Sequence, residues 1–223
     1  MNDLGHLPIA QVPPTMSVII LAAGYSSRMG QFKPLLSIGP CTALETVIHL
    51  FVSARVRDVC VVLGHRASEL RPLVKSAGAH CVLNPNFDRG MFSSIQAGVA
   101  ALPPDTEAAF IMPADIPLVD LSTVNKLISQ FAATKEDVIY PVFQNRRGHP
   151  TLISRTLFTE VLQAAPDSKL STLLASHEVN SCNVSVHDEA IHLDMDTPGD
   201  LSAIRKLAAE KLRGSDVARL SRQ

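Results

Sequence analysis

Apolar runs of strand length alternate along this chain with segments whose apolar residues recur every three or four positions. The runs within 17–23, 56–64 and 107–115 are continuously apolar, which is typical of strands buried on both faces of a sheet. Segments 42–54 and 120–133 place their apolar residues on one helical face. This alternation favours right-handed βαβ crossovers. The pattern therefore predicts an α/β fold in three layers, with a doubly wound, mostly parallel sheet between helices.

The same pattern predicts the remaining elements and a single folded domain. We expect the domain to span 17–213, between a loose, proline-rich tail at 1–16 and a C-terminal tail at 214–223. In such a sheet, ligands bind beyond the carboxyl ends of the strands, so the loops at those ends are where chemistry is expected. Further strands are expected at 80–84, 137–143, 151–154, 181–186 and 191–194, and further helices at 68–77, 93–102, within 155–176 and at 197–212.

Composition narrows the class of partner. The chain has 223 residues and a net charge of −1 at pH 7, which argues against a protein held on nucleic acid or on an anionic membrane by bulk charge. The four cysteines are widely spaced and form no metal-binding motif, so we expect reduced thiols in a cytoplasmic protein. The first residues lack the features of a secretory signal, and no apolar run approaches the ~20 residues of a membrane span.

The stretch LAAGYSSRMGQFKPLL, residues 21–36, follows the first predicted strand and concentrates glycines and cations. Gly24 and Gly30 permit backbone angles that other residues avoid, and the N–H groups between them can surround an anion. Arg28 adds a planar fork suited to phosphate oxygens, and Lys33 adds a compact charge. The spacing fits neither GxxxxGK[ST] nor GxGxxG. We therefore expect a polyphosphate-binding loop, with a surface turn carrying incidental cations as the alternative.

The order of residues in this loop resembles a signature of nucleotidyltransferases, L-A-A-G-x-S-x-R-M-G-x-x-K-P-L. Within that superfamily the chain most resembles the MobA-like NTP transferases, and among those the molybdenum cofactor cytidylyltransferases. The resemblance extends to PADIPLVD, RGHPTLI and LDMDTPGDL and covers roughly residues 17–212. It implies a Rossmann-like nucleotidyltransferase fold and an activity that joins a nucleotide to a phosphorylated acceptor.

The resemblance also implies which residues contact the nucleotide. In the segment G-M-x-S-S, Gly90, Ser93 and Ser94 are weaker candidates, because serines at a helix start also act as caps. Phe92 stands in that segment where related sequences often carry serine. The first loop would contribute Leu21, Ala22, Ala23, Gly24, Ser26, Ser27, Arg28 and Lys33.

Two acidic motifs are expected near the same end of the sheet. Asp115 ends the fourth predicted strand, and a carboxylate beside a triphosphate requires a cation such as Mg²⁺ between them. The resemblance assigns Asp115 that metal-binding role, and it leaves Asp196 with either a metal-binding or a supporting role. In LDMDTPGD, Thr197, Pro198 and Asp200 are also explained as the start of a helix.

The segment NRRGHPTLIS supplies two candidates for binding the acceptor, Arg147 and His149. Arginines in a loop are also typical of a solvated face, but an acceptor that carries a phosphate would use them. A general base is not needed, because the attacking phosphate is already ionised. We therefore interpret His149 as a binding residue.

These features lead to a hypothesis of function. Arg28, Lys33 and Asp115 would be the catalytic residues and Mg²⁺ the cofactor, with CTP and a molybdopterin cofactor as substrates and a molybdoenzyme as a further partner. Ala23 favours CTP, since guanylyl-transferring relatives tend to read LAGG and the added methyl narrows the base pocket. The alternatives are the same chemistry on a sugar or polyol phosphate, a non-catalytic chaperone that delivers the cofactor, and, more remotely, a dinucleotide-dependent oxidoreductase.

Overall fold

The centre of the molecule is one eight-stranded sheet, seen in a computed structural model that describes residues 14–220, with side chains to residue 213. The strand order is β10-β7-β9-β6-β1-β4-β5, and β8 pairs with β7. Only β8 and β9 run antiparallel to their neighbours. The strands are β1 (Met16–Ala22), β4 (Asp58–Leu63), β5 (His80–Leu83), β6 (Ala108–Pro113), β7 (Val138–Phe143), β8 (Arg146–Arg147), β9 (Thr151–Ser154) and β10 (Ser181–Ser185).

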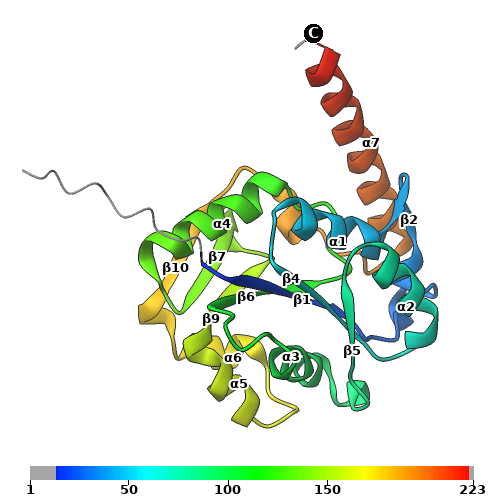
Figure 1. Cartoon of the computed structure of the whole chain (residues 1–223). Coiled ribbons are helices and arrows are strands. Elements are labelled where there is room, and N and C mark those ends of the chain that lie inside the picture. The colour runs from blue at the N-terminus through cyan, green and yellow to red at the C-terminus, as the bar shows by residue number, and fades with distance from the viewer. Residues whose placement is uncertain (1–13, 221–223) are drawn as a thin grey trace, which may run out of the picture.

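Helices cover both faces of this sheet (Figure 1). One face carries α1 (Ala43–Ser53), α2 (Ala67–Ser76) and α4 (Leu121–Thr134). The opposite face carries α3 (Met91–Ala100), α5 (Phe158–Gln163) and α6 (Leu170–Ala175). A long helix, α7 (Pro198–Leu220), packs by its first part beside the small hairpin of β2 (Ser37–Ile38) and β3 (Cys41–Thr42) and then extends away from the body. The predicted three-layered α/β fold with a mostly parallel sheet is confirmed.

The strands β1 and β6 form the middle of the sheet and are buried along their whole length. Successive side chains of β1 point to opposite faces, so Val18 and Ile20 join the core under α1 and α4, while Ile19 joins the core under α3. On that second side a Cβ added to Gly98 would lie 2.3 Å from Ile19, so a glycine is required for α3 to pack this close. Because helices cover both faces of these strands, the apolar runs in the sequence are continuous rather than alternating.

Three local predictions were wrong. Residues 191–194 form no strand: Glu189–His192 is a 3₁₀ helix, with Ile191 buried against Gly148. Ser93 and Ser94 do not cap α3, because the helix already begins at Met91 and Gly90 is its N-cap. The last helix continues beyond the expected end at residue 212, to Leu220.

Three further expectations concern the cysteines, the two ends of the chain and membrane spans. The four cysteines are free, as predicted. Of the expected N-terminal tail, residues 1–13 lie outside the described part of the chain, as do residues 221–223 at the C-terminus. Within residues 14–220, no helix combines the length and the apolar character that crossing a membrane requires.

Candidate functional site

A cavity of about 370 Å³ opens beyond the carboxyl ends of β1 and β6. One wall is the glycine-rich loop after β1, the opposite wall is the segment that leads into α3, and the residues following β6 form the floor. This is the position that a parallel sheet assigns to its ligand. The lining residues are Leu21, Ala22, Ala23, Gly24, Tyr25, Ser26, Lys33, Pro34, Phe87, Asp88, Gly90, Met91, Ser94, Pro113, Ala114 and Asp115.

Sheet pairing brings Asp115 beside the glycine-rich loop. Leu21 and Pro113 are partners in the parallel register of β1 and β6, and the N–H of Ala114 donates to the carbonyl of Leu21 at 3.1 Å. Asp115 follows at once and lines the cavity floor. The expected position of this carboxylate beside the glycine-rich loop is therefore present.

The glycine-rich loop owes its shape to Ser26 and Gly30 rather than to Gly24. Ser26 has φ 58° and Gly30 φ 67°, both left-handed, and a short 3₁₀ turn lies between them. The Ser26 hydroxyl accepts a hydrogen bond from the backbone N–H of Lys33 at 3.1 Å, which closes the loop on itself. Gly24, which could adopt such an angle, has no left-handed φ in the structure. A Cβ added at Gly24 would meet no atom within 4 Å, so the protein leaves open space there.

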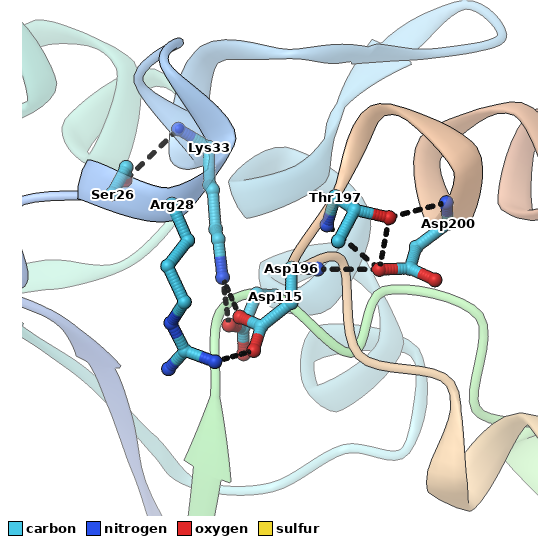
Figure 2. Close-up of polar contacts among 7 residues, drawn as sticks. All are labelled: Ser26, Arg28, Lys33, Asp115, Asp196, Thr197 and Asp200. Carbon is cyan, nitrogen blue, oxygen red and sulfur yellow. Dashed lines mark hydrogen bonds and ion pairs between the residues drawn. The ribbon is translucent and has the colours of Figure 1, made fainter.

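Lys33 lies between two carboxylates at the cavity floor (Figure 2). Its Nζ donates to Asp115 Oδ2 at 2.9 Å and also to Asp196 Oδ1. Asp196 reaches this point from the far end of the chain because the N–H of Met195 donates to the carbonyl of Asp115 at 3.0 Å. The predicted meeting of loop cation and mid-chain carboxylate thus includes a second carboxylate.

The charges in this cluster stabilise one another. Burial disfavours the Lys33 ammonium, but hydrogen bonds to Asp196 and Asp115 outweigh it and raise the pKa of Lys33. The hydrogen bond from Lys33, followed by the charges of Lys33 and Arg28, holds the pKa of Asp196 below its usual value despite burial. At neutral pH the cluster therefore contains an ammonium ion beside an ionised Asp196.

Arg28 forms the outer part of the cluster. Its guanidinium donates to the second oxygen of Asp196, while 80% of its side chain is exposed. An exposed ion pair of this kind is weak and exchanges its partner readily. Arg28 is therefore available to an incoming anion, although neither it nor Ser27 lines the cavity itself.

The helix that follows Asp196 starts as the sequence predicted. The Thr197 hydroxyl accepts from the N–H of Asp200 at 3.3 Å, and the Asp200 carboxylate accepts from the N–H of Thr197 at 2.7 Å. The same carboxylate accepts from the N–H of Asp196 at 3.2 Å. This capping box fixes the backbone from which the Asp196 side chain points to Lys33 (Figure 2).

The two serine candidates on the opposite wall of the cavity have different surroundings. Ser94 lines the cavity together with Gly90, whose φ of 105° turns the chain into α3. Ser93 is buried and donates to the carbonyls of Gly90 and Asn86 at 2.8 and 2.9 Å. The Asn84 amide donates to both serine hydroxyls, at 2.9 and 3.0 Å. Ser93 therefore stabilises this wall by hydrogen bonds within it, and Ser94 and Gly90 face the cavity.

The two acceptor candidates lie outside the cavity lining. Arg147 donates to both carboxylate oxygens of Glu178, at 2.8 and 2.6 Å, and stacks at 4.1 Å over the ring of Tyr140. His149 is half-buried, and burial lowers its pKa, an effect partly offset by the Ile111 backbone and by the charge of Asp115. Its Nδ1 is buried and has no hydrogen-bond partner. The charge of Asp115 thus acts on the pKa of His149, whereas Arg147 is paired with Glu178.

The residues at the floor fit a Mg²⁺ ion that would be shared with substrate. Asp115 and Asp196 both contact the single Nζ of Lys33, so their oxygens already converge on one cation. Among residues 14–213, no cluster of three or more acidic, histidine or cysteine ligands forms a complete metal cage. Two carboxylates completed by phosphate oxygens and water are the ligand set that Mg²⁺ prefers.

Sequence reasoning missed the aromatic rim of the cavity, formed by Tyr25 and Phe87. Their rings are 5.3 Å apart, so they join the two walls. Tyr25 lies inside the stretch 21–36 that the sequence had already singled out, and Phe87 lies three residues before Gly90. Their place at the rim depends on the contact between the two rings in the folded chain, which a sequence does not reveal.

Comparison with known proteins agrees with this geometry. Residues 18–181 match the model of the MobA-like NTP transferase domain. The chain is 28% identical to the molybdenum cofactor cytidylyltransferase of Escherichia coli (strain K12), covering 86% of this chain and 96% of the relative. It is 25% identical to the bifunctional protein GlmU of Mycobacterium avium (strain 104), covering 89% of this chain but 41% of GlmU.

A solved structure is similar over nearly the whole fold. Rv0371c of Mycobacterium tuberculosis H37Rv superposes with a TM-score of 0.76 at 26% identity, covering 88% of this chain and 100% of that one. Its complex with manganese gives a TM-score of 0.73 at 24% identity, covering 86% and 98% of the two chains.

Proposed function

This chain belongs to the MobA-like NTP transferase family, and from that premise we propose that it transfers CMP from CTP to a molybdopterin cofactor carrying molybdenum. A phosphate oxygen of the acceptor attacks the α-phosphorus, the bond to the β-phosphate oxygen breaks, and pyrophosphate leaves. The observation that carries the proposal is Lys33 held between Asp115 and Asp196 at the end of a glycine-rich loop.

The chain's own residues would act by position and charge. The N–H groups of the loop and the side chains of Lys33 and Arg28 would bind the triphosphate and balance the negative charge that builds up on the departing pyrophosphate. To do so, both cations exchange their present partner, Asp196, for phosphate oxygens. Holding acceptor and α-phosphorus in line would supply most of the remaining acceleration.

Asp115 and Asp196 would hold Mg²⁺. When bound, the ion supplies positive charge to the phosphate oxygens. Release of Lys33 leaves two carboxylates whose repulsion favours a divalent cation. A structure of the relative Rv0371c was solved in complex with manganese, which supports a divalent metal ion for this family.

Ala23 supports CTP as the nucleotide. It is buried and lines the cavity at the end of β1, so its methyl group occupies space that a purine would need. The relative named molybdenum cofactor cytidylyltransferase supports the same choice and the same acceptor. A molybdoenzyme that receives the finished cofactor would then be a partner of this chain.

Arg147 and His149 are the residues that we propose for the acceptor side. His149 supports this because its Nδ1 is buried without a hydrogen-bond partner and the charge of Asp115 acts to raise its pKa. Arg147 would act from the fixed position that Glu178 gives it. An Arg147→Ala variant should raise the KM of the acceptor and leave that of the nucleotide unchanged.

A second candidate is the same transfer to another phosphorylated acceptor, such as a sugar or polyol phosphate. It is favoured by the match to GlmU, which has nearly the same identity as the match to the cytidylyltransferase. A third candidate, a chaperone that delivers the cofactor without catalysis, is opposed by the complete set of Arg28, Lys33 and Asp115.

Two measurements test the proposal. Calorimetry with CTP and GTP in the presence of Mg²⁺ should show tighter binding of CTP, and tighter binding of GTP would contradict the nucleotide choice. Pyrophosphate release should be fastest with molybdopterin among a panel of phosphorylated acceptors. Faster release with a sugar phosphate would favour the second candidate, and no release with any acceptor the third.

A further inference from the structure

His65 lies at the centre of an aromatic cluster behind the glycine-rich loop. Its ring centroid is 4.9 Å from that of Tyr25, 5.9 Å from that of Phe32 and 6.5 Å from that of Phe87. None of these residues carries a charge required by the reaction. Such spacing is that of attractive ring pairs.

The contacts of His65 reach both ends of the loop. At the start, its backbone N–H donates to the carbonyl of Ala23 at 3.1 Å, and its ring packs on Tyr25. At the end, its ring packs edge-on against Phe32, the residue before Lys33. Arg66 also lies over the ring of Phe32, with its guanidinium carbon 4.4 Å from the ring centroid.

Phe87 links this cluster to the opposite wall of the cavity. Its ring is 5.3 Å from that of Tyr25, and both residues line the cavity. Phe87 comes this close only because position 64 is glycine, where an added Cβ would lie 2.5 Å from the Phe87 ring. Three loops therefore meet at His65, from the ends of β1, β4 and β5.

We infer that His65 is a positioning residue for nucleotide binding: its ring, through Tyr25 and Phe32, holds the glycine-rich loop in its anion-binding shape before the nucleotide arrives. The inference rests on nucleotide binding by this loop, not on the choice of CTP or of the acceptor. A loop already held in shape loses less conformational entropy when it binds. Tyr25 is 53% exposed, so its ring adds little to the core and acts mainly on the loop.

The test compares pairs of variants that remove or keep a ring. His65→Ala and Tyr25→Ala should each raise the Kd of the tightest Mg²⁺–nucleoside triphosphate about tenfold, the effect expected from losing two or three ring contacts. His65→Phe and Tyr25→Phe should stay within about twofold of the unchanged protein. His49→Ala, an exposed histidine on α1 away from the cavity, is the matched control and should leave the Kd unchanged.

Hydrogen exchange of residues 24–32 in the free protein gives a readout of loop shape. Exchange there should be faster in both alanine variants than in their phenylalanine counterparts, at an unchanged Tm. Unchanged exchange and Kd in His65→Ala and Tyr25→Ala would overturn the inference. So would a His65→Phe variant as weak as His65→Ala, because the imidazole itself would then be needed. The ratio of the Kd of each variant to that of the unchanged protein is measured with whichever of CTP, GTP, ATP and UTP binds best. A wrong choice of CTP as the nucleotide therefore does not affect the test.

Discussion

The Asp196 carboxylate accepts a hydrogen bond from Lys33 Nζ, which joins two residues 163 positions apart at the floor of the cavity. Each of these groups has another proposed task, since Lys33 would bind phosphate and Asp196 would bind the metal. The pair therefore balances the charges of Lys33 and Asp196 in the absence of ligand. Binding of nucleotide together with a divalent ion would separate it.

Asp196→Asn tests this exchange. Without the carboxylate, Lys33 and Arg28 lose a competing partner, so metal-free nucleotide should bind about tenfold more tightly, a difference of about 1.4 kcal/mol. Metal-dependent transfer should fall by about 100-fold, because a ligand for the ion is lost. Calorimetry with and without a chelator measures the first effect, and pyrophosphate release the second.

Asp200→Asn is the companion variant, because Asp200 supports the same backbone without contacting either cation. It should change both quantities far less than Asp196→Asn does. Equal effects of the two variants, or metal-free binding that weakens in Asp196→Asn, would contradict the exchange.

The pair also makes stability depend on pH. The pKa of Asp196 is lowered on folding, mainly by its hydrogen bond from Lys33, so its contribution is complete above the usual value near 4 and is lost as the pH falls through the lowered pKa. The pKa of Lys33 is raised, so its contribution is complete below about pH 10.5 and is lost as the pH rises through the raised pKa.

Urea unfolding at pH 2.5–7 should therefore show a free energy of unfolding that falls below about pH 4. The fall should be shallower in Asp196→Asn, whose side chain does not titrate. Parallel curves for the two proteins in this range would show that the ion pair adds nothing to stability.

Gly24→Ala separates folding from ligand binding. An added Cβ meets no atom within 4 Å, so the free energy of unfolding should change by less than about 0.5 kcal/mol. The methyl group would instead enter the space left for phosphate, and the Kd of Mg²⁺–nucleotide should rise at least about tenfold.

Gly30→Ala is the contrasting change, because its φ of 67° strains any residue with a Cβ. It should lower stability by about 1 kcal/mol. A Gly24→Ala variant that binds nucleotide normally would place the phosphates elsewhere.

Much of this site followed from the sequence because it depends on local patterns and on the geometry of parallel sheets. Continuous apolar runs predicted β1 and β6, and the ends of adjacent parallel strands placed Asp115 beside the loop. The contact of Asp196 with Lys33 could not be predicted, because it depends on a backbone hydrogen bond from Met195 to Asp115.

The errors have the same origin in tertiary contacts. The run at 191–194 has the composition of a strand, but Ile191 is buried against Gly148 in a 3₁₀ turn. Ser93 has the composition of a cap, but its hydroxyl donates back to the carbonyl of Gly90. In both segments, tertiary contacts outweighed the structure that the local sequence favours.

Ala23→Gly tests the choice of base. Removing the methyl group widens the cavity at the end of β1, so the ratio of the Kd of GTP to that of CTP should fall by about tenfold. The Kd of CTP itself should change by no more than about threefold. Competition calorimetry measures both Kd values. An unchanged ratio would show that Ala23 does not determine the choice between CTP and GTP.

The most direct test of the central claim is Mg²⁺-dependent release of pyrophosphate from CTP with molybdopterin, compared between the unchanged protein and Lys33→Ala. We predict one pyrophosphate for each cytosine dinucleotide formed, and a rate lower by about 10² to 10³ in Lys33→Ala. Lys126→Ala, at an exposed lysine on α4, should keep the full rate. Equal rates in all three proteins would contradict the claim that Lys33, held by Asp115 and Asp196, acts in nucleotidyl transfer.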